Sequence, residues 1–371
     1  MKILVTGGMG FVGSHLVDAL VKEGHDVVSF DNLERQVHEG RKPNYLNNGC
    51  RYIMGDMRNK AQLKAAISGI DIIFHEAAMV GVGQSMYKVS KYIWVNSLGT
   101  ANLLDILVND KHGVRKLIVA SSMSIYGEGA YKCRYCGIVY PQLRPEAQLK
   151  NKEWEVCCPK CKGPVKHIPT AEDKPLFPTS VYAYSKKEQE DLCLLIGRTY
   201  GMPTVALRYF NIYGPRQALS NPYTGVCAIL SARIKNNHSP LIYEDGLQSR
   251  DFIHVRDIVR ANLFVMRNSK ADFCALNVGT GRPTTILDIA RILIKLYEAG
   301  ALKPDILSSC RKGDIRHCYA DTSAIRSLGF KANIGIEEGM QDLKGWAREV
   351  QAKDKVALAD RQLLKRGLRA A

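Results

Sequence analysis

Residues 1–13, MKILVTGGMGFVG, join a short apolar run to a glycine-rich turn. Gly7, Gly10 and Gly13 form the pattern G-x-x-G-x-x-G, and an amphipathic segment follows from Phe11 to Val21. A strand, a glycine turn and a helix in this order are typical of a dinucleotide-binding fold, because glycine lets the backbone approach a pyrophosphate at the helix N-terminus. Glycines also suit an ordinary turn, but their place between a strand and a helix favours the binding function.

The next apolar run, DVVSF at 26–30, leads to Asp31. A carboxylate at the end of this second strand can bind the ribose hydroxyls of adenosine and would repel a 2′-phosphate. The residue therefore favours NAD over NADP. Arg35 lies nearby and argues against this preference, because an arginine can accommodate the 2′-phosphate of NADP.

Further apolar runs alternate with helical stretches along the first half of the chain. The expected strands are Ile70–Phe74, Lys116–Ala120 and Thr204–Leu207, and the expected helices are Tyr92–Val108 and Tyr184–Thr199. This alternation predicts an α/β fold, a Rossmann-like doubly wound parallel sheet. We predict a Rossmann-like domain over 1–215 interrupted by an insertion at 130–169, a smaller substrate-binding lobe over 216–350 with a helix near 285–296, and a basic tail over 351–371.

Composition limits the class of protein further. The chain has 371 residues, of which 46% are hydrophobic and 24% charged, which is the balance of a soluble globular protein and excludes wholesale disorder. It has neither an apolar run of roughly 18 residues nor the zones of a secretory signal, so we expect a cytoplasmic protein without a membrane span. The net charge of +16 favours an anionic partner, such as a phosphorylated ligand, nucleic acid or an acidic membrane surface.

Candidate catalytic residues follow the central strands. Tyr182 and Lys186 are four residues apart, so on a helix they share one face, where the ammonium can lower the pKa of the phenol. The strand at 116–120 ends in SSMSIYG, at the carboxyl edge of the sheet where ligands bind in such folds. A serine there could hydrogen-bond a reacting hydroxyl, although serines also serve as turn formers.

Several motifs in this order resemble one family. They are TGGMGFVG at 6–13, DNL at 31–33, GDMR at 55–58, HEAA at 75–78, N-x-x-G-T at 96–100, SSMSIYG at 121–127, YAYSK at 182–186, RYFNIYGPRQ at 208–217, RDFIHV at 250–255 and NVGTG at 277–281. This set resembles the extended short-chain dehydrogenase/reductase family, specifically its nucleotide-sugar epimerases and dehydratases. The resemblance implies tightly held NAD in one lobe, a nucleoside diphosphate sugar in the other, and a homodimer.

The resemblance also implies a role for individual residues. Ser122, Tyr182 and Lys186 would be catalytic. The cofactor would contact Gly7, Gly10, Phe11, Val12, Gly13, Asp31, Asn32, Asp56, Met57, Ala77, Ala78, Asn96, Tyr182, Lys186 and Tyr209, with Asp56 at the adenine. The substrate would contact Ser124, Asn211, Arg250, Arg311 and Asp314.

The dehydratases of the family carry an Asp-Glu pair directly after the catalytic hydroxyl residue, where this chain has Met123 and Ser124. The resemblance therefore implies epimerisation, at C4 through a transient 4-keto sugar, with NAD regenerated. Within the family the chain is most similar to the dTDP-L-rhamnose 4-epimerase type, through SSMSIYGEGAY at 121–131 and RQALSNPYTGV at 216–226. UDP-glucose or UDP-uronate 4-epimerases and an NAD(P)H-dependent keto-sugar reductase are the alternatives.

The insertion holds two pairs of cysteines, Cys133-x-x-Cys136 and Cys158-x-x-Cys161. Four thiolates in such pairs predict a structural zinc site, although Cys157 leaves the ligand set open and redox-active or accidental pairs are the alternative. Since the insertion separates the two catalytic motifs, we expect a lid over the sugar site. Six of its basic residues give a second hypothesis, nucleic-acid binding, which we favour less; they are Lys132, Arg134, Lys152, Lys160, Lys162 and Lys166.

Overall fold

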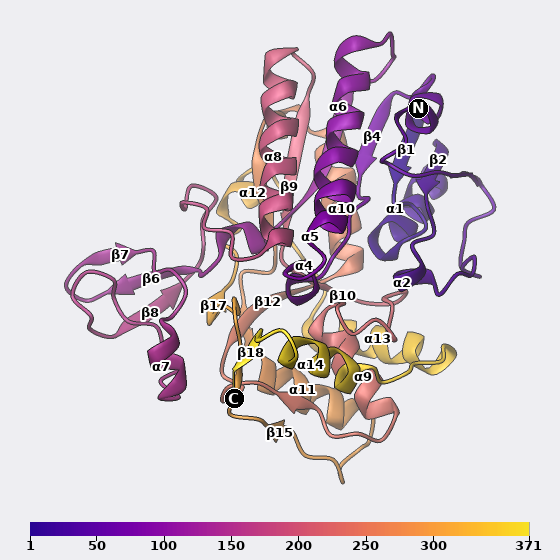
Figure 1. Cartoon of the computed structure of the whole chain (residues 1–371). Helices are drawn as coiled ribbons and strands as arrows, with labels where there is room; N and C mark the ends of the chain where they lie inside the picture. The colour runs from indigo at the N-terminus through magenta and orange to yellow at the C-terminus, as the bar shows by residue number, and fades with distance from the viewer. Residues whose placement is uncertain (371) are drawn as a thin grey trace.

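The computed structural model of the chain describes residues 1–370 and contains a central sheet of seven parallel strands (Figure 1). Their order across the sheet is β13-β9-β5-β4-β1-β2-β3. The strands are β1 (Lys2–Thr6), β2 (Asp26–Asp31), β3 (Cys50–Met54), β4 (Ile72–His75), β5 (Lys116–Ser122), β9 (Thr204–Tyr209) and β13 (Ala275–Val278). The predicted Rossmann-like α/β fold is confirmed.

Helices cover both faces of this sheet. They are α1 (Phe11–Lys22) and α10 (Val255–Arg267) on one face, and α3 (Lys60–Ile67), α6 (Gly99–Asn109) and α8 (Val181–Thr199) on the other. Strand side chains alternate between the two apolar clusters: Ile3 and Val5 pack with α1, whereas Leu4 packs with α3 and α6. Both faces are buried, as a parallel sheet requires.

Two helices differ in detail from the sequence-based expectation. The stretch expected as a single helix, 92–108, is α5 (Val89–Tyr92), a π-helical turn η1 (Ile93–Leu98) and α6. Helix α8 begins after Ser180, whose hydroxyl accepts the N–H of Ala183 at 3.1 Å and so caps the helix. This cap places Tyr182 in the first turn of α8.

The second lobe contains a smaller sheet covered by helices. Its strands are β10 (Asn211–Tyr213), β12 (Ser249–His254), β14 (Pro283–Thr285) and β17 (His317–Cys318), and its helices are α9 (Val226–Lys235), α11 (Ile286–Leu296) and α13 (Ile336–Glu349). The three helices pack together around Ile289, Leu293 and Met340, which are fully buried. The predicted helix near 285–296 is present, with Thr285 as its cap.

The predicted boundary at residue 215 does not match the sheets. Strand β13 pairs with β9 and completes the large sheet, although it lies within 216–350. Conversely, β10 lies within 1–215 but pairs with β12 in the second lobe. The chain thus crosses between the lobes several times, because each apolar strand pairs where a sheet edge is open. The lobes are interleaved in sequence.

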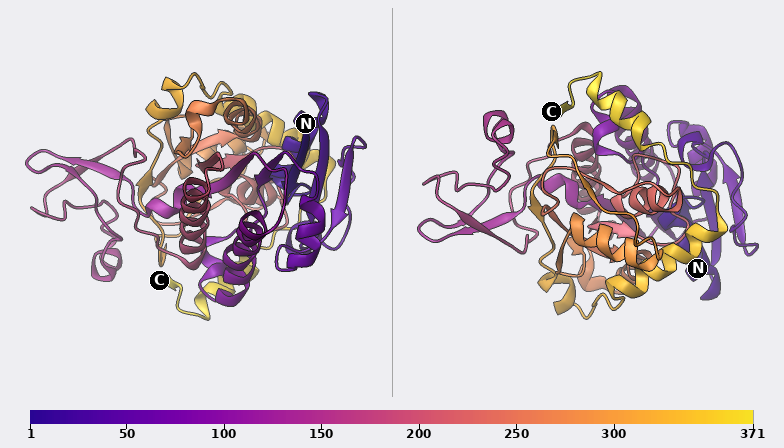
Figure 2. Two further views of the ribbon diagram at one scale, coloured as in Figure 1. Left: turned by 90° about the horizontal axis from the view of Figure 1, so that it is seen from above. Right: turned by 90° about the horizontal axis from the view of Figure 1, so that it is seen from below.

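The insertion and the C-terminal segment have structures of their own. The insertion forms a three-stranded sheet and a short helix that project away from the body: β6 (Ala130–Cys133), β7 (Gly137–Val139), β8 (Val165–Ile168) and α7 (Glu146–Lys150) (Figure 2). The segment predicted as a basic tail forms α14 (Val356–Leu364) and β18 (Arg369–Ala370), which pairs with β16 (Cys310–Arg311).

The remaining short elements connect these parts. They are α2 (Arg35–His38), α4 (Val82–Ser85), η2 (Met123–Tyr126), β11 (Leu241–Ile242), η3 (Ser269–Ala271), β15 (Asp305–Ile306) and α12 (Ser323–Ser327). Within residues 1–370, no helix combines the length and apolar character needed to cross a bilayer.

Candidate active site

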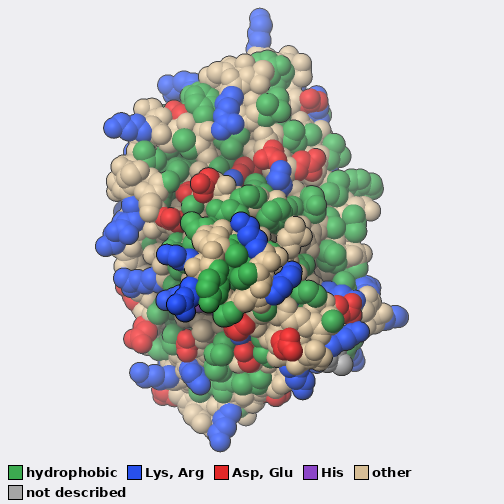
Figure 3. All heavy atoms as spheres, turned by 90° about the vertical axis from the view of Figure 1, so that its left-hand side faces the viewer, with side chains coloured by type: hydrophobic (Ala, Val, Ile, Leu, Met, Phe, Trp, Pro, Cys, Tyr) green, Lys and Arg blue, Asp and Glu red, His purple; other side chains and the backbone are tan. Residues whose placement is uncertain are grey.

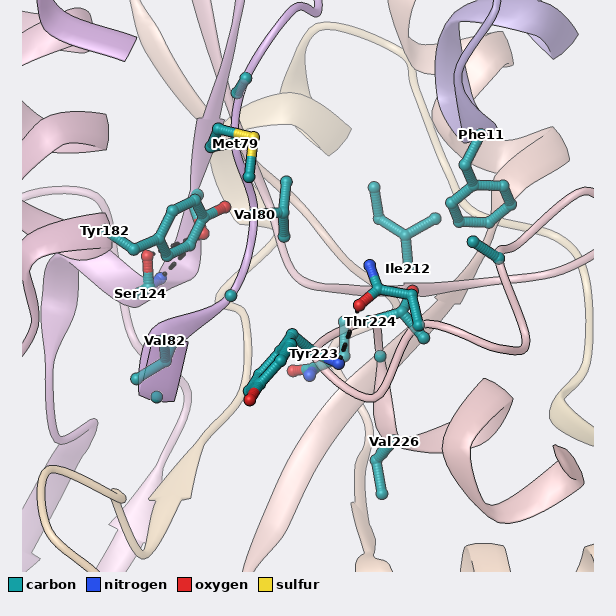
Figure 4. Close-up of a pocket in the computed structure, with 18 of the residues that line it drawn as sticks. Phe11, Met79, Val80, Val82, Ser124, Tyr182, Ile212, Tyr223, Thr224 and Val226 are labelled. Atoms are coloured by element: carbon teal, nitrogen blue, oxygen red, sulfur yellow. Dashed lines mark hydrogen bonds between the residues drawn. The ribbon is translucent and has the colours of Figure 1, made fainter. Parts of the chain in front are cut away.

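A cavity of about 620 Å³ is lined by residues of both lobes and runs from the glycine turn to the loops of the second sheet. Figure 4 shows Tyr182 and Ser124 on the first-lobe side of this cavity, with Tyr223, Thr224 and Val226 contributed by the second lobe. The predicted site residues that line it are Gly7, Gly10, Phe11, Val12, Gly13, Asp31, Asn32, Asp56, Met57, Ala77, Ala78, Ser122, Ser124, Tyr182, Lys186, Tyr209, Asn211, Arg250, Arg311 and Asp314.

The glycine turn forms a close-packed cradle at one end of the cavity. Gly7 has a φ of +70°, and a Cβ there would lie 2.9 Å from the backbone of Ala77. A Cβ on Gly13 would lie 2.2 Å from the carbonyl oxygen of Gly7. Gly10 precedes α1 and has no side chain to cap it, so the first N–H groups of the helix face the cavity. The cradle suits a pyrophosphate.

Carboxylates stand at the ends of β2 and β3. Asp31 is 8% exposed, and its two oxygens accept the N–H groups of Met9 at 3.0 Å and Leu33 at 2.8 Å. Asp56 pairs with Arg58 at 2.6 Å and accepts a hydrogen bond from Asn32. The Arg58 hydrogen bonds hold the pKa of Asp56 far below its usual range. Neighbouring backbone and side-chain donors therefore hold both carboxylates in place, and both line the cavity beside the glycine turn.

Asn96 differs from its predicted position, because it is fully buried and does not line the cavity. Its amide accepts the N–H of Met79 at 2.7 Å and donates to the carbonyl of Met79 at 3.1 Å. It also donates to the hydroxyl of Ser185 at 2.9 Å. Asn96 thus ties the loop after β4 to α8, and Met79 contacts the cavity in its place.

Ser122, Tyr182 and Lys186 meet in the cavity, as the motifs predict. The hydroxyl of Ser122 accepts hydrogen bonds from the N–H and the hydroxyl of Ser124, at 3.2 and 2.9 Å. Burial raises the pKa of Tyr182, and the Ser122 hydroxyl beside it acts in the opposite direction.

The ammonium of Lys186 is not directed at Tyr182. It donates to the side-chain oxygen of Gln189 at 2.6 Å. Burial lowers the pKa of Lys186 to about 8, and Glu76 opposes this shift. The expected lowering of the phenol pKa by the ammonium is absent from this arrangement, in which the lysine hydrogen-bonds Gln189.

Glu76 is a cavity residue that the sequence analysis did not single out. It accepts a hydrogen bond of 2.8 Å from the hydroxyl of Tyr209, which in turn accepts one of 2.7 Å from Asn262. Burial raises the pKa of Glu76 to about 7. The signal was present in HEAA at 75–78, which places a carboxylate directly after β4, at the carboxyl edge of the sheet.

The second lobe supplies cations and amides to the other end of the cavity. Arg311 pairs with Asp314 at 2.8 Å and lies over the ring of Tyr243, 4.6 Å from its centroid. Among the described residues, none hydrogen-bonds the buried side-chain oxygens of Asn211, Gln217 and Gln248, all of which line the cavity. Unpartnered buried oxygens are costly, so they suit a ligand that donates hydrogen bonds. The sequence analysis did not predict the two glutamines.

The C-terminal segment also lines the cavity, which no sequence motif indicated. Its contributing residues are Val356, Ala359, Asp360, Leu363 and Leu368. The side-chain oxygen of Gln362 accepts hydrogen bonds from the hydroxyls of Tyr87 and Tyr223, at 2.8 and 2.7 Å. The segment is therefore part of the cavity wall, not a free tail.

The four paired cysteines come together in the insertion. The Sγ atoms of Cys133, Cys136, Cys158 and Cys161 all lie within 4.8 Å of one another, whereas Cys157 is exposed and outside the group. Thiolates about 2.3 Å from a tetrahedral zinc would be about 3.8 Å apart, so the cluster fits this ion. Backbone N–H groups of Cys161 and Lys160 lower the pKa of the Cys158 thiol to about 6.

The insertion does not cover the cavity, in contrast to the lid that we expected. No residue of 128–178 lines it. Both stems of the insertion hydrogen-bond to the chain beside β17: the N–H of Gly129 to His317 and that of Thr170 to Tyr319. This pairing directs the insertion along the second lobe and outward (Figure 2).

Comparison with known proteins identifies the family. Residues 3–142 and 159–279 match the model of the NAD dependent epimerase/dehydratase family. The chain belongs to this family. The family predicted from the motifs is thereby confirmed.

Two curated relatives match nearly the full length of this family member. A dTDP-L-rhamnose 4-epimerase of Burkholderia thailandensis is 33% identical, over 95% of this chain and 97% of the relative. A putative UDP-glucose 4-epimerase of Methanocaldococcus jannaschii is 31% identical, over 93% of this chain and 98% of the relative.

Solved structures of the family share the fold. UDP-glucose 4-epimerase of Thermotoga maritima, solved with UDP-glucose, has a TM-score of 0.76 and 29% identity, covering 94% of this chain and 99% of its own. UDP-glucuronic acid 4-epimerase of Bacillus cereus, solved with UDP-glucuronic acid and NAD, also has a TM-score of 0.76, with 26% identity over 95% of this chain and all of its own.

Proposed function

We propose that the protein is a nucleotide-sugar 4-epimerase that uses tightly bound NAD. The observation that carries the proposal is that Ser122, Tyr182 and Lys186 line the same cavity as the glycine turn and the arginines of the second lobe. A dinucleotide and a nucleotide sugar that enter from opposite ends would meet at these three side chains. Asp31 favours NAD over NADP at the adenosine end.

The chain's own residues account for the proton chemistry. Tyr182 takes the proton from the sugar hydroxyl and returns it, while Ser122 hydrogen-bonds the same oxygen. Lys186 lines the same part of the cavity and would contact the bound cofactor. Bound NAD would accept hydride from the sugar carbon and, after the keto sugar turns over, return it to the opposite face of that carbon, which inverts the centre. Since Met123 and Ser124 replace an acid-base pair at the neighbouring positions, loss of water has no catalyst.

The identities of the sugar and the nucleobase are the second part of the proposal. The relative from B. thailandensis supports dTDP-L-rhamnose, and the relatives named for UDP-glucose and UDP-glucuronate support UDP sugars as the alternatives. Arg311 supplies positive charge for a diphosphate, and the unpartnered amide oxygens of Asn211, Gln217 and Gln248 suit sugar or base donors.

Incubation with a panel of dTDP- and UDP-sugars, followed by product analysis by NMR, tests the proposal. We expect the C4 epimer of one donor to form without added cofactor. Formation of a reduced sugar only when NADPH is supplied would replace the epimerase with a keto-sugar reductase.

We propose that the cysteine cluster of Cys133, Cys136, Cys158 and Cys161 holds structural zinc. The small sheet β6–β8 has a core of only a few buried side chains, including Tyr131, Val139 and Val156. A module of this size commonly depends on a metal for its stability, because its apolar core is too small.

We also propose a cytoplasmic homodimer. Large apolar side chains are exposed on the adjoining helices η1 and α8: Trp94 is 57% exposed, Leu98 44%, Tyr184 61% and Leu195 58%. An apolar face of this kind is typical of a subunit interface. Light scattering should report a dimer, and Trp94→Glu together with Leu195→Glu should shift it toward monomer.

Nucleic-acid binding by the insertion is the second candidate function. Figure 3 shows Lys and Arg side chains around apolar ones on the face from which the insertion projects. The six basic residues of the insertion named in the sequence analysis are all exposed, as are Tyr135 and Ile138. Salt-dependent binding to a random DNA duplex would support this function; we expect only marginal binding.

A further inference from the structure

A cluster of charged side chains, in which Arg144, Glu244 and Arg316 are buried, joins the insertion to the second lobe. The guanidinium of Arg316 is fully buried and contacts Glu155 at 2.6 Å, Asp245 at 2.7 Å and Glu244 at 3.0 Å. The guanidinium of Arg144 donates two hydrogen bonds to Glu244, at 2.8 and 3.0 Å. The side chains of Arg144 and Glu244 are only 2% and 3% exposed.

The members of this cluster come from three separate segments. Arg144 and Glu155 lie in the insertion, between its two cysteine pairs. Glu244 and Asp245 form the turn after β11, and Arg316 lies between β16 and β17. Buried charges are tolerated only when each has its partners, so the three segments must keep their mutual positions.

The same contacts hold the backbone that carries the candidate substrate residues. Glu128, at the stem of the insertion, accepts the N–H groups of Arg316 at 2.7 Å and His317 at 2.8 Å. Arg144 donates to the carbonyl of Asp314 at 3.3 Å. Segment 311–317 is thus attached to the insertion and its stem through Asp314, Arg316 and His317.

Segment 311–317 also positions the cationic end of the cavity. It contains Arg311 and Asp314, which line the cavity. Its carbonyls at Ile315 and Arg316 accept hydrogen bonds of 2.6 and 2.9 Å from the guanidinium of Arg250, a third cavity residue. A shift of this segment would therefore displace all three side chains at once.

We propose that Arg144 and Glu155 are positioning residues for the nucleotide sugar. They act from outside the cavity, by holding segment 311–317 so that Arg311, Asp314 and Arg250 present a preformed site to a nucleoside diphosphate. The inference rests on the proposed function. It gives the insertion a role in substrate binding without contact with the substrate, and it leaves Ser122, Tyr182 and the dinucleotide cradle unaffected.

Variants on the insertion test this role. Arg144→Ala removes the bidentate contact with Glu244, Arg144→Lys retains the charge, and Glu155→Gln removes one charge facing Arg316. Glu153→Gln is the matched control, because Glu153 is exposed and its carboxylate has no partner among the described residues. The readouts are the Kd of dTDP and of UDP by calorimetry, kcat and KM on the accepted sugar, bound NAD and the melting temperature.

We expect Arg144→Ala to raise the Kd of the nucleoside diphosphate and KM by roughly 10-fold to 100-fold, with kcat and NAD content close to wild type. Arg144→Lys should recover part of the affinity. Glu155→Gln should raise both constants by about threefold, since Arg316 keeps two carboxylates. The control should behave as wild type.

A folded Arg144→Ala that binds dTDP and UDP as tightly as wild type would overturn the inference, whatever its melting temperature. If that variant does not fold, unchanged binding by Glu155→Gln overturns it, because the Glu155 side chain is 64% exposed and we expect its replacement to leave the fold intact. A wild-type protein that binds neither nucleotide would instead contradict the proposed function.

Discussion

The hydroxyl groups of Tyr87 and Tyr223 lie 2.6 Å apart, although the two residues belong to different lobes. Both hydroxyls also donate to Gln362 of α14, and the guanidinium of Arg366 lies 4.2 Å from the centroid of the Tyr87 ring. The C-terminal segment therefore connects the two lobes beside the cavity, which Tyr223 lines.

Gln362→Ala should weaken this connection. We expect KM for the nucleotide sugar to rise by about threefold to tenfold with little change in kcat, because two hydrogen bonds that close the cavity wall are lost. Arg361→Ala is the control, since its exposed side chain contacts only its own helix. Steady-state kinetics of both variants measure KM, and equal KM values would show that the hydrogen bonds of Gln362 do not contribute to substrate binding.

Tyr182→Phe should lower kcat by ~10²–10⁴, the usual contribution of one general acid-base group, and leave substrate affinity nearly unchanged. The ring keeps its contacts, so the loss reports the hydroxyl alone. Tyr184→Phe, two residues further along α8 and 61% exposed, should turn over as wild type. Turnover of Tyr182→Phe near the wild-type rate would reject the mechanism.

The purified protein should carry NAD(H) that survives desalting. An epimerase that returns its hydride regenerates the cofactor and gains nothing by releasing it. Heat denaturation followed by chromatography of the released nucleotide measures the content. Protein that is free of nucleotide and prefers NADPH would contradict this prediction and the assignment of Asp31.

Metal analysis should give about one zinc per chain. Cys133→Ser with Cys136→Ser should lose the metal, because two thiolates cannot complete a tetrahedral shell. Cys157→Ser should keep it, since this thiol lies outside the cluster. Full zinc content in the double variant, or loss in Cys157→Ser, would show that the ligand set is a different one.

Glu76→Gln should change how stability depends on pH. The pKa of Glu76 is raised to about 7 by burial, against about 4.3 in an unfolded chain. The stability it contributes is therefore fully present below about pH 4 and is lost as the pH rises through about 7.

Glutamine keeps an acceptor for Tyr209 but does not ionise. The melting temperature of Glu76→Gln should increase relative to that of wild type as the pH rises from 4 to 8. The two proteins are compared at equal NAD content. Glu153→Gln, at an exposed position, should follow wild type throughout. Parallel melting curves for Glu76→Gln and wild type would exclude ionisation of this carboxyl in that range.

The spacing of neighbouring residues in the sequence was enough to predict much of the first lobe and of the candidate site. The strand, glycine turn and helix at 1–21, Asp31 after the second strand, and Tyr182 four residues before Lys186 each depend on neighbours within a turn or two. Each cysteine pair is equally local, whereas the tertiary structure brings the two pairs together and leaves Cys157 outside the cluster. Short-range geometry is set by backbone dihedrals and residue type, so it can be predicted from the sequence.

Only the tertiary structure decided which distant residues meet. Glu76 reaches Tyr209, Arg144 reaches Glu244, and Gln362 reaches Tyr87 across separations of about one hundred residues or more. The same packing places the insertion beside the second lobe and not over the cavity. It also places the C-terminal segment, predicted as a basic tail, in the lining of the cavity. Such contacts depend on how sheets and helices pack as whole surfaces, and no periodicity within a single segment encodes that arrangement.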